Sequence, residues 1–220
     1  RLYMGWRRIR NWGTWTSMKR LALQGAAGAS EEIPPDDGFL VLPPERYPEI
    51  PEIVSAAKQT VRPELLGPLE RKKDYLINHL DPSKIVPDSP FVRFALRPDV
   101  LSTVSRYLGV APVLSSINVF CSVWRSKYLG GSQLWHCDAD DLSQVKIFVL
   151  CSEVSPENGP LTILGAAHSN RVRSNVGYQF RERVRDEDLF RHVSEADVER
   201  LTGQEGTVCF VDTSRCFHCG

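Results

Sequence analysis

Leucines recur at helical spacing in the first half of the chain, with charged residues on the opposite face. The clearest case is Pro63 to Leu80, where the leucines predict a buried stripe and a charged run predicts the solvated face. Proline and Asp99 open a second predicted helix, Pro98 to Leu108, and Gly109 ends it. A shorter helix is expected over about Glu49 to Thr60, so the pattern predicts a helical front to the protein.

From residue 113 the pattern changes to short segments rich in β-branched and aromatic residues, separated by turn-forming residues. The predicted strands are Val113–Trp124, Gln133–Asp138, Gln144–Cys151, Leu161–Leu164 and Thr207–Val211. A helical insertion is expected at about 169–203, where Ser194 would cap a helix over Glu195–Leu201. Because the strands do not alternate with helices, the pattern indicates an antiparallel sandwich or jelly roll. The expected class is therefore α+β, mainly β with N-terminal helices.

Length and charge limit the organisation of the chain. Its 220 residues are 42% hydrophobic and 25% charged, which is enough to bury one sizeable core. We expect a basic segment and loop over 1–48 and a single domain over 49–220, in which 49–112 support a core at 113–220. The 27 basic and 27 acidic residues cancel, which argues against a nucleic-acid partner. No apolar run approaches the roughly 20 residues that span a bilayer, so no transmembrane segment is expected.

The start of the chain is basic, since arginines and lysines precede Glu31, the first acidic residue. This segment also holds Trp6, Trp12 and Trp15 and resembles an organelle transit peptide. The interpretation that we favour is a basic helix packed on the domain by its tryptophans.

The six cysteines bear on the cellular compartment. They are Cys121, Cys137, Cys151, Cys209, Cys216 and Cys219. Since none follows the spacing of a small secreted domain, we expect reduced, buried thiols and a cytoplasmic protein. Cys216 and Cys219 form a CxxC motif, for which structural zinc is the alternative. If that segment is a strand, the two thiols point to opposite faces and cannot chelate one ion.

Three residues carry candidate metal chemistry: His136, Asp138 and His218. In an extended segment successive side chains point to opposite faces, so His136 and Asp138 project together. His218 follows the predicted strand Thr207–Val211, from which the fold can bring it alongside. Two imidazoles and one carboxylate can bind one face of a ferrous ion and leave positions open for a cosubstrate and O₂. By itself the motif is weak evidence, because a polar turn explains it equally well.

A series of motifs in fixed order makes this interpretation more specific. The segments are Gln133–Asp138, Val145–Leu150, Glu157–Leu161, Gly165–His168 and Gly206–His218. Together they resemble the phytanoyl-CoA dioxygenase family of iron(II)- and 2-oxoglutarate-dependent oxygenases, over about residues 113–220. The resemblance implies a double-stranded β-helix, which is a cupin-like jelly roll, with His136, Asp138 and His218 as the iron ligands.

The resemblance also implies a reaction. 2-Oxoglutarate would chelate the iron, O₂ would take the last open position, and a small organic substrate would be hydroxylated or desaturated. Asp138 argues against halogenation, because related halogenases lack this carboxylate. In that family an arginine beyond the distal histidine holds the far carboxylate of 2-oxoglutarate. We expect this arginine and the last jelly-roll strand to lie beyond residue 220.

Other polar residues are candidates for contacts with 2-oxoglutarate. These are Gln133, Lys146 and Asn118. Lys146 lies in an apolar run, and a buried ammonium needs a partner, which could be the cosubstrate, Asp140 or Asp141.

The remaining histidines are not expected to be ligands. His168 is expected to be structural or to support the site, and His79 and His192 are expected to be solvated. Two classes of function stay open on these residues: the iron(II)/2-oxoglutarate oxygenase and a non-catalytic jelly-roll binding module. A structural or hydrolytic zinc site is a third alternative.

Overall fold

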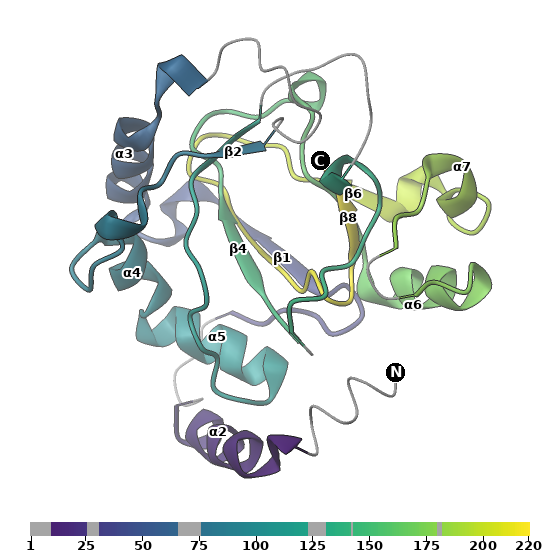
Figure 1. The fold of residues 1–220 in the computed structure, drawn as a ribbon, viewed down its shortest axis with the longest axis horizontal. Coiled ribbons are helices and arrows are strands. Elements are labelled where there is room, and N and C mark those ends of the chain that lie inside the picture. Colours follow the sequence, from purple (N-terminus) through teal and green to yellow (C-terminus); the bar gives the residue numbers. More distant parts are fainter. Residues whose placement is uncertain (1–9, 26–30, 66–75, 123–130, 142, 180–181) are drawn as a thin grey trace.

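The computed structural model describes residues 10–25, 31–65, 76–122, 131–141, 143–179 and 182–220. Its α-helices are α2 (Trp12–Gly25), α3 (Ile50–Thr60), α4 (Pro90–Ala95), α5 (Pro98–Leu108), α6 (Ala166–Asn175) and α7 (Asp186–Leu189). Short 3₁₀ turns occur at Pro44–Arg46, Pro63–Leu65, Pro82–Lys84, Gly131–Gln133, Pro156–Asn158 and Glu195–Asp197. Helices α3, α4 and α5 lie on one side of the strands, and α6 and α7 lie on the other (Figure 1).

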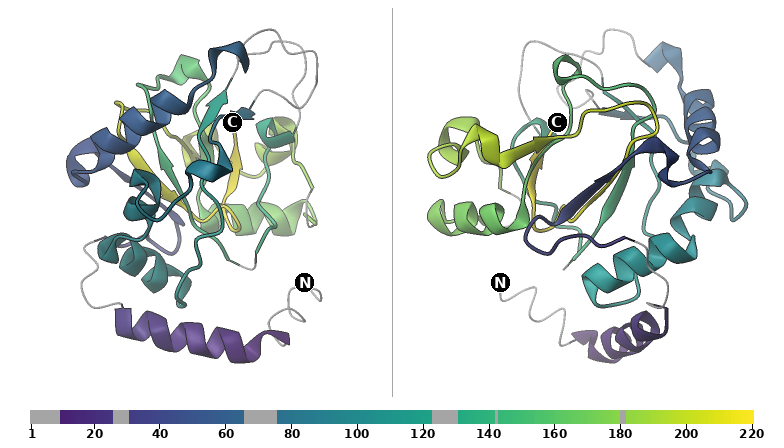
Figure 2. Two further views of the ribbon diagram at one scale, coloured as in Figure 1. Left: turned by 60° about the vertical axis from the view of Figure 1, so that its left-hand side comes forward. Right: turned by 180° about the vertical axis from the view of Figure 1, so that it is seen from behind.

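The strands form antiparallel sheets, so the described chain is a mixed α+β protein, as the sequence predicts at this level. In the sheet that we call the β7 sheet, β7 (Val208–Val211) lies between β1 (Phe39–Leu42) and β4 (Lys146–Val149). In the β5 sheet, β5 (Thr162–Leu164) lies between β6 (Val198–Arg200) and β8 (Phe217–Cys219). Strands β2 (Leu76–Asn78) and β3 (Phe120–Ser122) form a separate pair. The further views show the same succession of helices, strands and helices (Figure 2).

Side chains of β7 alternate between two cores. Val208 and Phe210 belong to the cluster that also contains residues of α3 and α5. Cys209 and Val211 belong to a different cluster, which joins the β7 sheet to Ile163 of the β5 sheet. All four β7 residues are buried, since both faces of this strand are covered.

The β5 sheet alternates in the same way. Leu164 and Phe217 belong to the cluster beneath α6 and α7, whereas Ile163 and Cys216 belong to the cluster between the two sheets. Since successive side chains of a strand point to opposite faces, His218 points from β8 toward the space between the sheets. This alternation decides where the candidate metal ligands lie.

Two of the predicted helices are confirmed. Helix α3 covers most of 49–60, and α5 has the predicted bounds and ends where expected. Gly109 adopts a positive φ of 67° there, and its N–H donates to the Ser105 carbonyl at 2.8 Å.

The prediction of a helix from Pro63 to Leu80 is wrong at both described ends. Residues 63–65 form a 3₁₀ turn, residues 76–78 form β2, and the part between them lies outside the described residues. The β2 residues instead pair with β3, from Leu76 opposite Ser122 to Asn78 opposite Phe120. Backbone bonds to a distant strand outweigh the local leucine periodicity.

The predicted helix over Glu195–Leu201 is also wrong. Ser194 does act as an N-cap, accepting from the Ala196 N–H at 3.2 Å, but it caps only the 3₁₀ turn Glu195–Asp197. The chain then forms β6, in which Val198 lies opposite Leu164 of β5. The rest of the insertion is helical in part, as expected, through α6 and α7.

The predicted strands vary in extent. Those containing β4, β5 and β7 are confirmed. Val113–Trp124 contributes only β3 within the described residues, and Gln133–Asp138 begins with a 3₁₀ turn and pairs through two isolated bridges.

The basic helix α2 packs beside α5, where the Ala111 N–H donates to the Met18 carbonyl at 2.9 Å. The expected packing by tryptophans is wrong for Trp12, which is 60% exposed, whereas Trp15 is half-buried and Trp6 lies outside the described residues. None of the helices in the described ranges is long and apolar enough to cross a membrane. All six cysteines are free thiols, but only Cys137, Cys209 and Cys216 are buried as predicted, and the other three are half-buried.

Candidate metal centre

Backbone hydrogen bonds bring the His-Cys-Asp segment beside the chain that contains His218. The His136 N–H donates to the His218 carbonyl at 3.1 Å, and the His218 N–H donates to the His136 carbonyl at 2.9 Å. The Asp138 N–H donates to the Thr213 carbonyl at 2.8 Å. Residues far apart in the sequence are therefore held together by main-chain bonds that do not depend on their side chains.

Side chains along this extended segment alternate between its two faces. Trp135 and Cys137 belong to the cluster beneath α6 and α7, so His136 and Asp138 project to the other side, where His218 also points. The Trp135 indole N–H donates to Asp186 at 2.7 Å, and the Cys137 N–H donates to the Tyr178 hydroxyl at 3.1 Å. These bonds anchor the rear of the segment and limit its rotation.

The three side chains converge. Potential ligand atoms of His136, Asp138 and His218 all lie within 4.8 Å of one another. Asp138 Oδ1 is 3.8 Å from His136 Nε2, and Asp138 Oδ2 is 3.7 Å from His218 Nε2. With bonds of about 2.1 Å, ligand atoms on one octahedral face lie roughly 3 Å apart, so a small contraction would close the site around an ion. It is the one such group within the part of the chain that the structure describes.

Both histidines have the same orientation relative to the carboxylate. His136 Nδ1 lies 2.8 Å from the Leu134 carbonyl, and His218 Nδ1 lies 3.1 Å from the Cys216 carbonyl. A carbonyl can only accept, so each Nδ1 carries the proton and each Nε2 keeps its lone pair. Metal-binding histidines are commonly held in this way, by a hydrogen bond from the ring nitrogen that does not bind the metal.

The protonation states suit a cation. Burial lowers the pKa of His136, and burial together with the nearby His136 charge lowers the pKa of His218 to about 4. Burial tends to raise the pKa of Asp138, but His218 and Lys146 outweigh it, and the net shift is downward. At neutral pH the site therefore presents two neutral imidazoles and one carboxylate, the forms that bind metal without first releasing a proton.

The His218 pKa predicts a pH dependence of the metal-free protein. In the unfolded chain this imidazole takes a proton near pH 6.5, whereas in the folded protein it does so only near pH 4. Protons therefore bind the unfolded state preferentially in this window, and the free energy of unfolding should fall by on the order of 3 kcal/mol as the pH drops through it. Urea unfolding of wild type and His218→Gln at several pH values measures the effect. Parallel pH dependence in the two proteins would contradict it.

Lys146 departs from expectation in both burial and partner. Its side chain is 45% exposed, and Nζ lies 2.6 Å from Asp138 Oδ2 rather than beside Asp140 or Asp141. The contact is an ion pair, and it helps to lower the pKa of Asp138. The Lys146 ammonium is thus one of the groups that keep this buried carboxylate ionised.

Thr213 is a supporting residue that the sequence analysis missed. Its carbonyl accepts from the Asp138 N–H, and a hydrogen bond from its side chain contributes to the lowered pKa of Asp138. Gln144 in turn donates to the Thr213 hydroxyl at 2.9 Å. A polar residue two positions after a buried strand is the only signal that the sequence offers for this role.

The structure does not bring Asn118 to the three ligands through any hydrogen bond. Its side chain is exposed and accepts from Asn78 at 2.9 Å, across the β2–β3 pair. Gln133 ends a 3₁₀ turn beside β8, where the Gly220 N–H donates to the Ser132 carbonyl. Their contact with a cosubstrate stays a prediction.

The other histidines lie apart from this group. His79 is 2% exposed, so the prediction that it is solvated is wrong, and its Nδ1 accepts from the Arg62 N–H at 3.0 Å. His192 is half-buried, with Nδ1 3.4 Å from the Asn175 amide. His168 is 3.7 Å from Asp197.

The two thiols of the CxxC segment point to different buried clusters. Cys216 precedes the strand Phe217–Cys219 and belongs to the cluster between the two sheets, whereas Cys219 packs against the cluster beneath α6 and α7. The buried Cys216 Sγ lies 3.4 Å from the Asp37 carbonyl, and burial raises the pKa of both thiols, for Cys219 to about 12. Without a cation nearby, this environment favours the protonated thiol at both positions.

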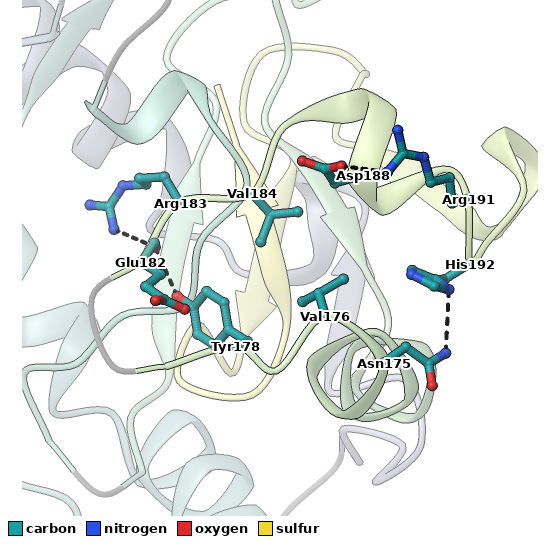
Figure 3. A pocket seen from close by; sticks show the side chains of 9 residues that line it. All are labelled: Asn175, Val176, Tyr178, Glu182, Arg183, Val184, Asp188, Arg191 and His192. Atoms are coloured by element: carbon teal, nitrogen blue, oxygen red, sulfur yellow. Dashed lines mark hydrogen bonds and ion pairs between the residues drawn. The ribbon is translucent and has the colours of Figure 1, made fainter.

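A cleft of about 470 Å³ opens on the helix side of the ligand segment (Figure 3). Its lining residues are Asn175, Val176, Tyr178, Glu182, Arg183, Val184, Asp188, Arg191 and His192. Val184 forms an isolated bridge with Trp135, whose side chain points away from the metal ligands. None of the three candidate ligands lines the cleft, so it is distinct from the metal centre.

Comparison with protein-family models and with curated proteins found no match to this chain. The geometry alone therefore characterises the site: a buried group of two histidines and one aspartate that could hold a metal ion. Such a group supplies three protein ligands and leaves further coordination positions for small molecules.

Proposed function

We propose that the protein is an iron(II)- and 2-oxoglutarate-dependent oxygenase that hydroxylates or desaturates a small organic substrate. The observation that carries the proposal is the shared orientation of His136 and His218, whose Nε2 atoms lie within 4 Å of the same Asp138 carboxylate. Two histidines and one carboxylate with open positions are the ligand set of non-haem ferrous oxygenases.

The sheets support a jelly-roll interpretation. Going along the chain, segments alternate between the two sheets: His136 beside β8, then β4 in the β7 sheet, then β5 and β6, then β7, then β8. The ligands lie on the face of the β5 sheet that is turned toward the β7 sheet. A metal in the mouth of a double-stranded β-helix would have this position.

The chain's own residues would have defined roles. His136, Asp138 and His218 would hold the ion, and the Leu134 and Cys216 carbonyls would fix the ring orientations. Iron, 2-oxoglutarate and O₂ would together supply the oxidant for a C–H bond, with succinate and CO₂ as products. Lys146 is a cation beside the carboxylate ligand and suits an anionic cosubstrate.

Anaerobic addition of Fe(II) and 2-oxoglutarate tests the proposal. We expect a metal-to-ligand charge-transfer absorption band, followed by succinate after air is admitted. His136→Ala should lose the band because it removes one ligand, whereas His168→Ala should keep it, since His168 lies 3.7 Å from Asp197 and outside the group. Absence of the band in wild type, or its persistence in His136→Ala, would refute the assignment. A band without succinate formation would favour the non-catalytic binding module.

A further inference from the structure

Lys146 forms an ion pair with Asp138, the carboxylate that a metal ion in this site would need as a ligand. Lys146 extends from β4, and its Nζ lies 2.6 Å from Asp138 Oδ2. The same oxygen is 3.7 Å from His218 Nε2, so the ammonium contacts the carboxylate oxygen that lies near a second candidate ligand. The ammonium thus takes the position of a counter-ion in the metal-free site.

The Lys146 ammonium can be displaced from Asp138 by another cation. The carboxylate is only 14% exposed, whereas the lysine side chain is 45% exposed and can swing outward on its flexible stem. An ammonium cannot coordinate a metal, and a dication bound to Asp138 would repel a positive charge a few ångströms away. A metal ion bound through Oδ2 would therefore displace the Lys146 ammonium or weaken its pair with Asp138 strongly.

The displaced ammonium remains attached to β4, next to the ligand group. There it would lie near coordination positions that no described side chain fills. A positive charge beside a metal ion is unfavourable until an anion joins them. A carboxylate bound to the metal would satisfy the ion and the ammonium together.

We propose that Lys146 is an exchangeable counter-ion: it pairs with Asp138 in the metal-free protein and with a metal-bound carboxylate ligand in the loaded protein. This inference rests on the proposed metal centre and deepens it. It assigns Lys146 two opposite effects, weakening the binding of metal alone and strengthening the binding of an anion to the loaded site. Metal and anion are then coupled through one side chain.

Calorimetric titration of Lys146→Met with Mn(II), a redox-stable probe, tests both effects. Without 2-oxoglutarate the variant should bind Mn(II) roughly tenfold more tightly than wild type, because the competing cation is gone. After loading with Mn(II), it should bind 2-oxoglutarate roughly tenfold more weakly. Lys58→Met is the matched control, since Lys58 is similarly exposed and pairs with Glu205 at 2.5 Å, outside the ligand group. The control should match wild type in both titrations.

The outcomes separate this inference from the proposed function. If wild type and Lys146→Met both fail to bind Mn(II), the metal centre itself is wrong. If wild type binds Mn(II) and Lys146→Met binds it equally or less tightly, the metal centre stands and the counter-ion role is overturned. If metal binding tightens while 2-oxoglutarate binding is unchanged, the pairing with a bound carboxylate is overturned. Lys146→Gln repeats the test should the methionine variant fold poorly, and circular dichroism establishes folding in each case.

Discussion

Replacement of His218 by alanine is expected to weaken Mn(II) binding by at least about a hundredfold, because it removes one of three protein ligands. The backbone bridge between residues 136 and 218 uses main-chain atoms, so the strand pairing should survive the substitution. The variant should therefore fold with wild-type secondary structure while losing the metal. Calorimetric titration with Mn(II), alongside circular dichroism, measures the two properties separately.

His168→Ala is the control for this experiment. His168 is also a histidine beside an aspartate, at 3.7 Å from Asp197, but its side chain is 38% exposed and lies outside the ligand group. The His168→Ala variant should bind Mn(II) with wild-type affinity. Wild-type affinity in His218→Ala would exclude His218 as a ligand and leave only the His136–Asp138 pair.

The sequence predicts well which side chains of the ligand segment point toward the metal centre, because side chains along an extended backbone alternate between two faces. This alternation places His136 and Asp138 on one face and Trp135 and Cys137 on the other, and the buried clusters agree. Alternation needs only an extended backbone, not a full strand, so it holds although the segment pairs through isolated bridges. The position of His218 follows from the same rule once β8 pairs with β5.

Partners of individual side chains could not be predicted in the same way. The apolar run around Lys146 predicts a buried ammonium with 2-oxoglutarate, Asp140 or Asp141 as its partner, yet the lysine is half-exposed and pairs with Asp138. The failure at Leu76–Asn78 has a similar cause, since its strand partner lies more than forty positions away, at Phe120–Ser122. Local patterns report which face of an element is buried, whereas the partner is decided by the tertiary arrangement.

A glycine near the start of β1 links the fold to the metal centre. Gly38 has a positive φ of 71°, and a Cβ added there would lie 2.7 Å from Cys216 Sγ and 3.0 Å from the Ala166 Cβ. Its N–H donates to the Pro34 carbonyl, and its carbonyl accepts from the Asp212 N–H, each at 2.8 Å. The backbone is therefore held in place and cannot easily move away from Cys216.

Gly38→Ala should lower the free energy of unfolding by about 2–4 kcal/mol, combining left-handed backbone strain with overpacking of a buried contact. The matched control is Gly109→Ala, because Gly109 has a similar φ of 67° but nothing within 4 Å of an added Cβ. Gly109→Ala should lower the free energy of unfolding only by the backbone strain, about 1–2 kcal/mol. Urea unfolding of both variants separates strain from steric overlap, and equal losses would show that the contact with Cys216 is easily relieved.

The same substitution should also weaken metal binding in the protein that remains folded. Cys216 supplies the carbonyl that lies 3.1 Å from His218 Nδ1, so a shift of Cys216 would rotate the ring or loosen its hold. Loss of such orienting contacts lowers metal affinity by roughly 10- to 100-fold in known metal sites. Mn(II) titration of Gly38→Ala at a temperature where it is fully folded should show a loss of this size, whereas Gly109→Ala should bind as wild type does. Unchanged affinity in Gly38→Ala would mean that His218 is oriented by the β5–β8 pairing alone.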